Sequence, residues 1–412
     1  MRRSILFLGL CVGLAALVGC RGGKPGQPDP GPPPVEWSAD VQTVADGQNA
    51  FAIDLYKKLA ADEENKGKNV FFSPYSVHAA LAMTATGAKG NTRDQMVKVL
   101  HLPVDDAKVL AAGDLGRYYD HPRKDYELSV ANALWGLKGF PWRPEWLATQ
   151  NERFGAGFNE AEFGTNPGAE RERINRWVEE KTRDRIKELL QPGQITSETT
   201  MVLTNAIYFK GKWVTQFDPK KTANAPFQCD DNTTADVPMM HTNAKCGYAR
   251  TTDGVTMVEL PYKGGELSMV VILPNPRDDL AALEKKLTPE LIAKWFAELK
   301  DRGELQVSLP KFKTETRYEL PKHLTALGMI DVFGGSADFT GMATSSPGWI
   351  AHVTHKAFVD VNEEGTEAAA ATAVVMVTSS FPPPFYANRP FLFLIRDVKH
   401  GTILFMGRVM KP

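Results

Sequence analysis

The residues whose types and spacing could do chemistry lie together near the C-terminal end of this 412-residue chain. Glu363-Glu364-Gly365-Thr366-Glu367 is followed by four alanines, a threonine and a β-branched run. Such a composition is typical of a strand narrow enough to slide between two others. The chemistry that it offers is backbone hydrogen bonding. We interpret residues 363–377 as a strand without a partner that begins with a hinge.

The two faces of this strand differ in charge. At a period of two, one face carries only small or β-branched side chains: Thr366, Ala368, Ala370, Thr372 and Val374. The other face carries Glu367, Ala369, Ala371, Ala373 and Val375. A buried carboxylate costs several kcal/mol, so the first face is the one expected to enter a core. Four alanines also fit a helix, which is the alternative, but Gly365 before them and three prolines after Phe381 oppose it.

No motif selects a catalytic or metal site. The chain has no G-x-S-x-G, H-E-x-x-H or P-loop pattern, and its Ser, His and Asp residues show no spacing that selects a triad. Cys229 and Cys246 lack histidines at zinc-ligand spacing, His241 excepted. We therefore expect no metal and no cofactor, and a hydrolase is the disfavoured enzymatic alternative. With a formal net charge of -1, the composition gives no reason to expect nucleic acid as a partner.

The N-terminus has the pattern of an export signal. Met1-Arg2-Arg3 is positive, and residues 4–18 are mostly apolar but too short to span a membrane as a mature helix. Leu17-Val18-Gly19-Cys20 resembles a bacterial lipobox, which implies cleavage after residue 19 and a diacylglyceryl group on Cys20. An ordinary signal peptide with an incidental cysteine is the alternative, since Cys11 also lies in the apolar stretch.

Residues 20–36 are expected to be a lipidated cysteine and a Pro/Gly-rich tether. The fourteen residues 21–34 would reach about 40 Å in an extended form. The chain is therefore predicted to be exported and lipid-anchored to the cell envelope, at the outer membrane or the cell surface, with the leaflet left open. In an oxidising compartment Cys229 and Cys246 could form a disulfide, which their spacing cannot establish.

Residues 37–412 show no second linker or repeat, which predicts one α+β domain with helices first and strands later. Ser73-Pro74 predicts the start of a helix over residues 77–83, Thr92–Gln95 has the pattern of a capping box, and Ile174, Trp177 and Val178 mark a further helix. The expected strands are 201–209, 255–260 with 267–273 around a Gly264-Gly265 turn, and 391–395 paired with 402–406.

From about residue 40 to the end, the chain resembles the serpins. The motifs that carry the resemblance follow the family's order and spacing: Asn69 to Ser76, Leu203 to Trp213, Ala337 to Met342, His355 to Ala357, the 363–371 hinge, and Asn388 to Phe391. The resemblance implies helices packed around a large mixed central β-sheet, additional sheets, and an exposed reactive-centre loop within residues 363–385.

The resemblance also implies an inhibitor that traps proteases. A serine protease, or also a cysteine protease, would attack the loop and form an acyl-enzyme, and the freed segment would then enter the central sheet. Counting from Gly365 and back from Pro390, the resemblance places the scissile bond at Ser379-Ser380, with Met376, Val377 and Thr378 as alternatives. Small residues there suit an elastase-like pocket, with broad specificity as the alternative, and no basic residue lies between Glu367 and Arg389 to suit a trypsin-like pocket.

The family's functional residues carry over as follows. The hinge comprises Glu363, Gly365, Thr366, Glu367, Ala368, Ala369, Ala370 and Ala371. Glu363 would pair with Lys311 at the top of the sheet, near Trp213. Ser73, Ser76, Asn205 and His355 would form a polar cluster where the sheet opens. Each has a purely structural alternative, for example a helix cap at Ser73.

The expected partners are few. They are an elastase-like protease, bound covalently, and a membrane, through the lipid anchor; the chain is expected to be a monomer. The alternative from another functional class is a non-inhibitory serpin that serves as a binding or carrier module.

Overall fold

The computed structural model describes residues 35–155, 158–229, 233–276, 278–366 and 384–412. Residues 34–412 form one compact unit. Within the described residues the α-helices are α1 Ala39–Ala60, α2 Pro74–Ala85, α3 Gly90–Val99, α4 Asp106–Val109, α5 Ala111–Asp120, α6 Pro144–Phe154, α7 Pro167–Lys181, α8 Leu280–Lys286, α9 Pro289–Glu298 and α10 Pro321–Leu327. Short 3₁₀ helices are η1 Glu63–Asn65, η2 Pro219–Lys221 and η3 Asp331–Phe333.

The strands follow the expected order, few in the first half and many in the second. They are β1 Val70–Phe72, β2 Tyr126–Leu137, β3 Phe158–Ala161, β4 Met201–Lys212, β5 Ala223–Gln228, β6 Thr234–Arg250, β7 Thr256–Pro261, β8 Leu267–Leu273, β9 Lys300–Pro310, β10 Phe312–Glu319, β11 Val353–Val361, β12 Gly365–Thr366, β13 Phe385–Tyr386, β14 Phe391–Asp397 and β15 Ile403–Val409. The predicted hairpins β7–β8 and β14–β15 are confirmed.

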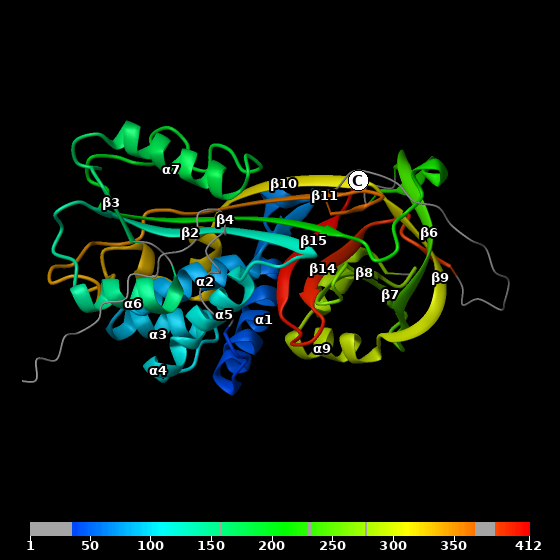
Figure 1. The fold of residues 1–412 in the computed structure, drawn as a ribbon, viewed down its shortest axis with the longest axis horizontal. Helices are drawn as coiled ribbons and strands as arrows, with labels where there is room; N and C mark the ends of the chain where they lie inside the picture. The colour runs from blue at the N-terminus through cyan, green and yellow to red at the C-terminus, as the bar shows by residue number, and fades with distance from the viewer. Residues whose placement is uncertain (1–34, 156–157, 230–232, 277, 367–383) are drawn as a thin grey trace, which may run out of the picture. The chain divides into compact units, whose positions relative to one another are not determined.

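In the described part of the chain the strands form two sheets. A six-stranded sheet has the order β10-β11-β12-β4-β2-β3 and mixes parallel and antiparallel pairs. A nine-stranded sheet has the order β1-β15-β14-β8-β7-β6-β9-β13, with β5 paired to β6. Figure 1 shows α7 over one face of the six-stranded sheet and α2, with its neighbouring helices, against the other. The predicted α+β class, with helices around a mixed central sheet, is confirmed.

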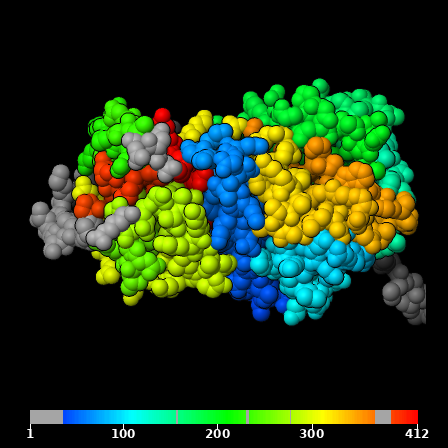
Figure 2. All heavy atoms as spheres, turned by 180° about the vertical axis from the view of Figure 1, so that it is seen from behind, coloured from blue at the N-terminus to red at the C-terminus, as the bar shows by residue number. Residues whose placement is uncertain are grey.

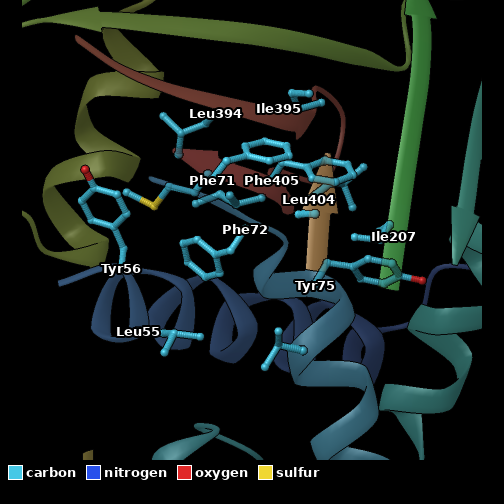
Figure 3. Close-up of a cluster of buried hydrophobic side chains, with 14 of the residues drawn as sticks. Leu55, Tyr56, Phe71, Phe72, Tyr75, Ile207, Leu394, Ile395, Leu404 and Phe405 are labelled. Atoms are coloured by element: carbon cyan, nitrogen blue, oxygen red, sulfur yellow. The ribbon is translucent and has the colours of Figure 1, made fainter. Parts of the chain in front are cut away.

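The main core lies between α1, α2 and the C-terminal strands. Phe71 of β1 stacks on Phe405 of β15, with ring centroids 5.4 Å apart and an interplanar angle of 3°. Figure 3 shows these rings above Tyr56 and Phe72, with Ile207 of β4 at the side. Strand β1 near the start of the domain pairs with β15 near its end. Both ends of the domain are therefore needed to complete this core.

Helix α2 begins as the sequence predicts, and α3 does not. Ser73 caps α2 by accepting from the backbone N–H of Ser76 at 3.1 Å, with Pro74 in the first turn. The capping box at Thr92–Gln95 is wrong, because α3 starts at Gly90 and both side chains serve the tertiary structure instead. Thr92 Oγ1 accepts from the N–H of residue 338, and Gln95 Oε1 accepts from the N–H groups of residues 330 and 331.

Helix α1 lies between two groups of later elements. In Figure 2, α1 belongs to the blue band that runs between the region of α8 and α9 on one side and the region of α10 on the other. Among the described helices, none combines the length and the apolar character that a membrane crossing requires.

Cys229 and Cys246 are both buried free thiols, so the disulfide that the sequence left open is not formed. Cys229 follows β5 beside the start of β6, whereas Cys246 lies near the far end of that seventeen-residue strand. About twelve residues at ~3.3 Å each separate the two positions by tens of Å, far beyond the reach of a disulfide.

Candidate functional site

The two central strands of the six-stranded sheet, β4 and β11, are paired over only part of their length. They run parallel from the register pair Val353–Leu203 to the pair Phe358–Tyr208. Beyond that point β12 lies between them, antiparallel to both. The sheet is therefore open at one end, and the first residues of the predicted inserting strand occupy the opening.

Backbone hydrogen bonds hold the turn that leads into β12. Trp213 N–H donates to the carbonyl of Glu364 and Phe217 N–H to that of Glu363, both at 2.8 Å. The indole Nε1 of Trp213 also donates to the carbonyl of Asn362 at 3.0 Å. Trp213 thus contacts the turn before β12 through both its backbone and its ring.

Position 365 has room only for glycine. A Cβ atom there would lie 2.0 Å from the carbonyl oxygen of Gly211 and 2.7 Å from the Cα of Lys212. Contacts this short with backbone atoms cannot be relieved by a side-chain rotation. Any larger residue at Gly365 would therefore push β12 out of the sheet or displace the end of β4.

Glu363 is tied to the neighbouring strands by its carboxylate. Lys311, between β9 and β10, places Nζ 2.9 Å from Oε2, and Thr222 Oγ1 donates to Oε1 at 2.9 Å. Burial alone would raise the pKa of Glu363, but the hydrogen bonds from Lys311 and Thr222 and the lysine charge outweigh it and hold this pKa below its ordinary value. The structure brings the predicted pair Glu363 and Lys311 together, whereas no sequence pattern pointed to Thr222.

Thr366 points into the core, where it meets an aromatic cluster. The side chain is 1% exposed, and its Oγ1 lies 2.7 Å from Oη of Tyr262. The Tyr262 ring stacks on Trp213, with centroids 4.6 Å apart and an interplanar angle of 13°, and meets Phe209 edge-on at 5.0 Å. Burial raises the pKa of Tyr262, so its hydroxyl keeps its proton and can donate.

The four residues of the predicted opening cluster lie together and are fully buried. Nε2 of His355 accepts from the backbone N–H of Ser73 at 3.0 Å, and its Nδ1 is bonded to Oδ1 of Asn205. Nδ2 of Asn205 donates to Oγ of Ser76 at 2.7 Å. The cluster therefore connects strands β4 and β11 to the start of α2.

These contacts fix the state of His355. A backbone N–H can only donate, so Nε2 carries no proton, and the Nδ1–H must donate to the amide oxygen of Asn205. Burial lowers the pKa of His355 to about 3, which keeps the imidazole neutral near pH 7.

Asn132 of β2 completes the cluster and was not predicted. Its Oδ1 accepts from Nδ2 of Asn205 at 2.7 Å and from Oγ of Ser76 at 3.0 Å. In register, Asn132 faces Asn205, which faces His355, so three neighbouring strands each contribute one polar residue to one row. The available signal was an asparagine inside the otherwise apolar run 130–135, where strands rarely tolerate it.

The hydrogen bonds between Asn132, Asn205 and His355 depend on the spacing of their strands. A strand inserted between β4 and β11 would increase their spacing from about 4.8 Å to about 9.6 Å, which breaks the bond between His355 and Asn205. Each buried group left without a partner costs about 1 to 3 kcal/mol. The cluster therefore resists opening unless the inserted strand supplies a replacement partner.

Several predicted site residues lie outside the described ranges. They are Cys20 at the proposed lipidation site, Glu367, Ala368, Ala369, Ala370 and Ala371 of the hinge, and Met376, Val377, Thr378, Ser379 and Ser380 of the loop. Within the described ranges, no group of three or more His, Cys, Asp or Glu side chains is arranged to hold a metal ion.

Known proteins match this chain over most of its length. The model of the serpin (serine protease inhibitor) family matches residues 46–412. Leukocyte elastase inhibitor of Bos taurus is 39% identical over 382 residues, which cover 90% of this chain and 100% of that protein. Serpin B3 of Homo sapiens is 38% identical over 396 residues, with 90% and 100% covered. The crystal structure of human thyroxine-binding globulin with its ligand has a TM-score of 0.82 at 28% identity and covers 91% of this chain and 100% of that one.

The matched span includes the partly opened sheet, the hinge in its opening and the polar cluster beneath it. The chain therefore belongs to the serpins, a family of serine protease inhibitors rather than enzymes.

Proposed function

We propose that this serpin inhibits serine proteases by suicide-substrate trapping and that its targets are elastase-like. The observation that carries the proposal is the placement of β12 between β4 and β11, where an inserting strand would have to start. The similarity to leukocyte elastase inhibitor supports the target class. Cysteine proteases also form acyl-enzymes, so the same trap extends to them.

The trap uses the protease's own chemistry. The protease nucleophile attacks the carbonyl of the scissile residue, an ester forms, and the new amino terminus leaves with the C-terminal part. The freed segment then enters the sheet behind Thr366. About fifteen residues at ~3.3 Å each would carry the ester some 50 Å. Ten to fifteen new ladder hydrogen bonds at about 0.5 to 1.5 kcal/mol each supply on the order of 10 kcal/mol to distort the protease.

The register of β12 supports this insertion. Thr366 pairs with Gly211 on β4, antiparallel. Continued one residue at a time on both sides, the same register would bring Thr372 between Asn205 and His355. A threonine hydroxyl there could accept from Nδ1 of His355 and donate to Oδ1 of Asn205. The inserting strand would thus replace the hydrogen bond that sheet opening breaks.

We place the cut at Ser379-Ser380, with Met376, Val377 and Thr378 as alternatives. A small residue at the cut suits a narrow pocket. Mass spectrometry of the released C-terminal peptide tests this assignment, and cleavage outside residues 376–381 would contradict it.

The deciding experiment is complex formation with an elastase-like protease on a denaturing gel. Wild type should give a complex that survives SDS, and protease whose nucleophile has been blocked should give none. Thr366→Arg is the matched variant, because it keeps the loop but cannot bury its side chain; it should be cleaved without a complex. Cleavage of the wild type without a stable complex would contradict the proposal.

A binding or carrier function is the second candidate. It is favoured by the likeness to thyroxine-binding globulin, which was crystallised with a bound ligand. On the same gel a carrier would be cleaved or ignored by the protease. The small-residue hinge argues for the inhibitor, because a carrier has no need of an insertable strand.

We also propose that the chain is exported and held at the cell envelope by a lipid on Cys20. The support is the sequence of residues 1–20. Labelled palmitate should enter the wild type and not Cys20→Ala. Equal labelling of both, or labelling of neither, would refute the anchor and leave the inhibitory proposal untouched.

A further inference from the structure

Tyr262 contacts Thr366 across β4 at a position where β4 has no side chain. That position is Gly211, the register partner of Thr366. A Cβ atom on Gly211 would lie 2.7 Å from Cζ of Phe209 and 2.9 Å from Cδ1 of Tyr262. The strand therefore lacks a side chain at the place where the Tyr262 ring passes. This arrangement lets a residue outside the six-stranded sheet contact the first inserted side chain.

The contact is isolated from water and rigidly held. Tyr262 is fully buried and Thr366 is 1% exposed, and within the described residues neither hydroxyl has another hydrogen-bond partner. The ring of Tyr262 is clamped by stacking on Trp213, and its backbone N–H donates to the carbonyl of Leu267 at 2.9 Å. Neither hydroxyl can turn to solvent if the other withdraws, so undocking Thr366 leaves the Tyr262 hydroxyl without a partner.

We infer that Tyr262 is a positioning residue of the trap. Its hydroxyl holds Thr366 in the opening, so that insertion after cleavage starts from a docked hinge. This inference rests on the proposed inhibitory function and deepens it. The rate at which the strand starts to insert competes with deacylation, which in typical enzymes turns over about 1 to 1,000 times per second. If Thr366 is less firmly docked, insertion starts more slowly, and a larger fraction of the serpin is cleaved and released as a substrate.

Paired substitutions test the contact. Tyr262→Phe and Thr366→Val each remove one hydroxyl and keep the shape of the side chain. Each should raise the number of serpin molecules consumed per protease inhibited about threefold to tenfold. The double variant leaves two apolar groups in contact and should return toward the wild-type value, and Thr366→Ser, which keeps the hydroxyl, should stay near it.

Tyr318→Phe is the matched control. Tyr318 is another buried tyrosine, and its hydroxyl accepts from the N–H of Phe71 at 3.4 Å, away from the hinge. Its loss should lower stability without changing the stoichiometry of inhibition. This control separates a positioning role from a general loss of a buried hydrogen bond.

A readout without protease keeps the inference testable on its own. Hydrogen exchange should accelerate at the backbone amides of Trp213 and Asn362, which donate to the hinge, in both single variants and not in Tyr318→Phe. If wild type forms no stable complex, the proposed function fails and the exchange result still judges the contact. Unchanged exchange in Tyr262→Phe, or an unchanged stoichiometry beside a working wild type, would overturn the inference.

Discussion

At Gly365 the chain passes so close to β4 that even a methyl group has no space. Gly365→Ala should therefore expel the hinge from the opening and turn most of the inhibitor into substrate. The expected loss is at least tenfold in complex formed per cleavage event, because several short backbone contacts must be relieved together. Gly335→Ala is the control, since nothing lies within 4 Å of the added atom. Densitometry of complex and cleaved bands measures the ratio, and equal ratios for both variants would contradict the steric argument.

His355 makes stability depend on pH in a defined direction. Its pKa is about 3 in the folded protein and 6.5 when the side chain is not buried. Between pH 3 and pH 6.5 the unfolded chain therefore binds more protons than the folded protein. Stability contributed by the neutral imidazole is present above pH 6.5 and is lost as the pH falls toward 3, by on the order of 5 kcal/mol in total. Urea unfolding at pH 7, 5 and 4 should show this fall.

The matched variant for this pH dependence is His355→Gln, which cannot take up a proton. Its free energy of unfolding should start lower at pH 7 and fall less steeply. His78, whose pKa burial lowers to about 4, will keep part of the slope in both proteins. Parallel curves for wild type and variant would show that His355 does not titrate as argued.

Single residues were predictable from the sequence where a motif surrounded them. Ser73, Asn205, His355 and Lys311 were assigned because the motifs around them resemble those of the serpins, and the structure brings them to the opening. Tyr262 was missed because its partner lies about a hundred residues away and no local pattern links them. A contact between distant segments has no signature in either segment alone.

At the scale of elements, the inserting strand should be sensitive to charge on one face only. Thr366 is buried, and residues 368 and 370 share its face by the period of two. Ala370→Glu should therefore slow insertion and raise substrate turnover strongly, because it places a carboxylate in the core. Ala369→Glu on the other face is the control and should matter much less. Equal stoichiometries of inhibition for the two variants would count against the parity argument.

Helix and strand cores were predictable, but their ends were set by tertiary contacts. The run 201–209 gave β4, yet the strand continues to Lys212, where β12 supplies a partner. The capping box at Thr92 failed for the same reason, because the side chain bonds a distant backbone N–H instead of its own helix. Local patterns report propensity, while partners elsewhere decide where an element stops.

At the scale of the whole molecule, cleavage in the loop should stabilise the protein. The freed strand can complete the sheet between β4 and β11, and gains on the order of 10 kcal/mol in ladder hydrogen bonds. The unfolding temperature should rise by roughly 10 to 20 °C after limited proteolysis. Differential scanning calorimetry of intact and cleaved protein measures the shift, with Ala370→Glu as the variant that should gain little. No rise in the cleaved wild type would exclude spontaneous insertion.

The global topology could not be derived from local patterns. The sequence predicted one α+β domain, but the pairing of β1 with β15 joins segments more than three hundred residues apart. The family resemblance implied a large mixed sheet but not the order of its strands, which the structure supplies. Hydrophobic periodicity says which residues are buried and not which strand lies beside which.

The two buried thiols have a practical consequence. Residues 35–412 contain only Cys229 and Cys246, and burial raises the pKa of the Cys246 thiol to about 12. A cysteine engineered on the surface of this part of the chain would then be the one thiolate readily offered to a maleimide dye at neutral pH. Two such dyes, one on each side of the opening between β4 and β11, would turn the parting of the sheet into a change in fluorescence that can be followed in real time.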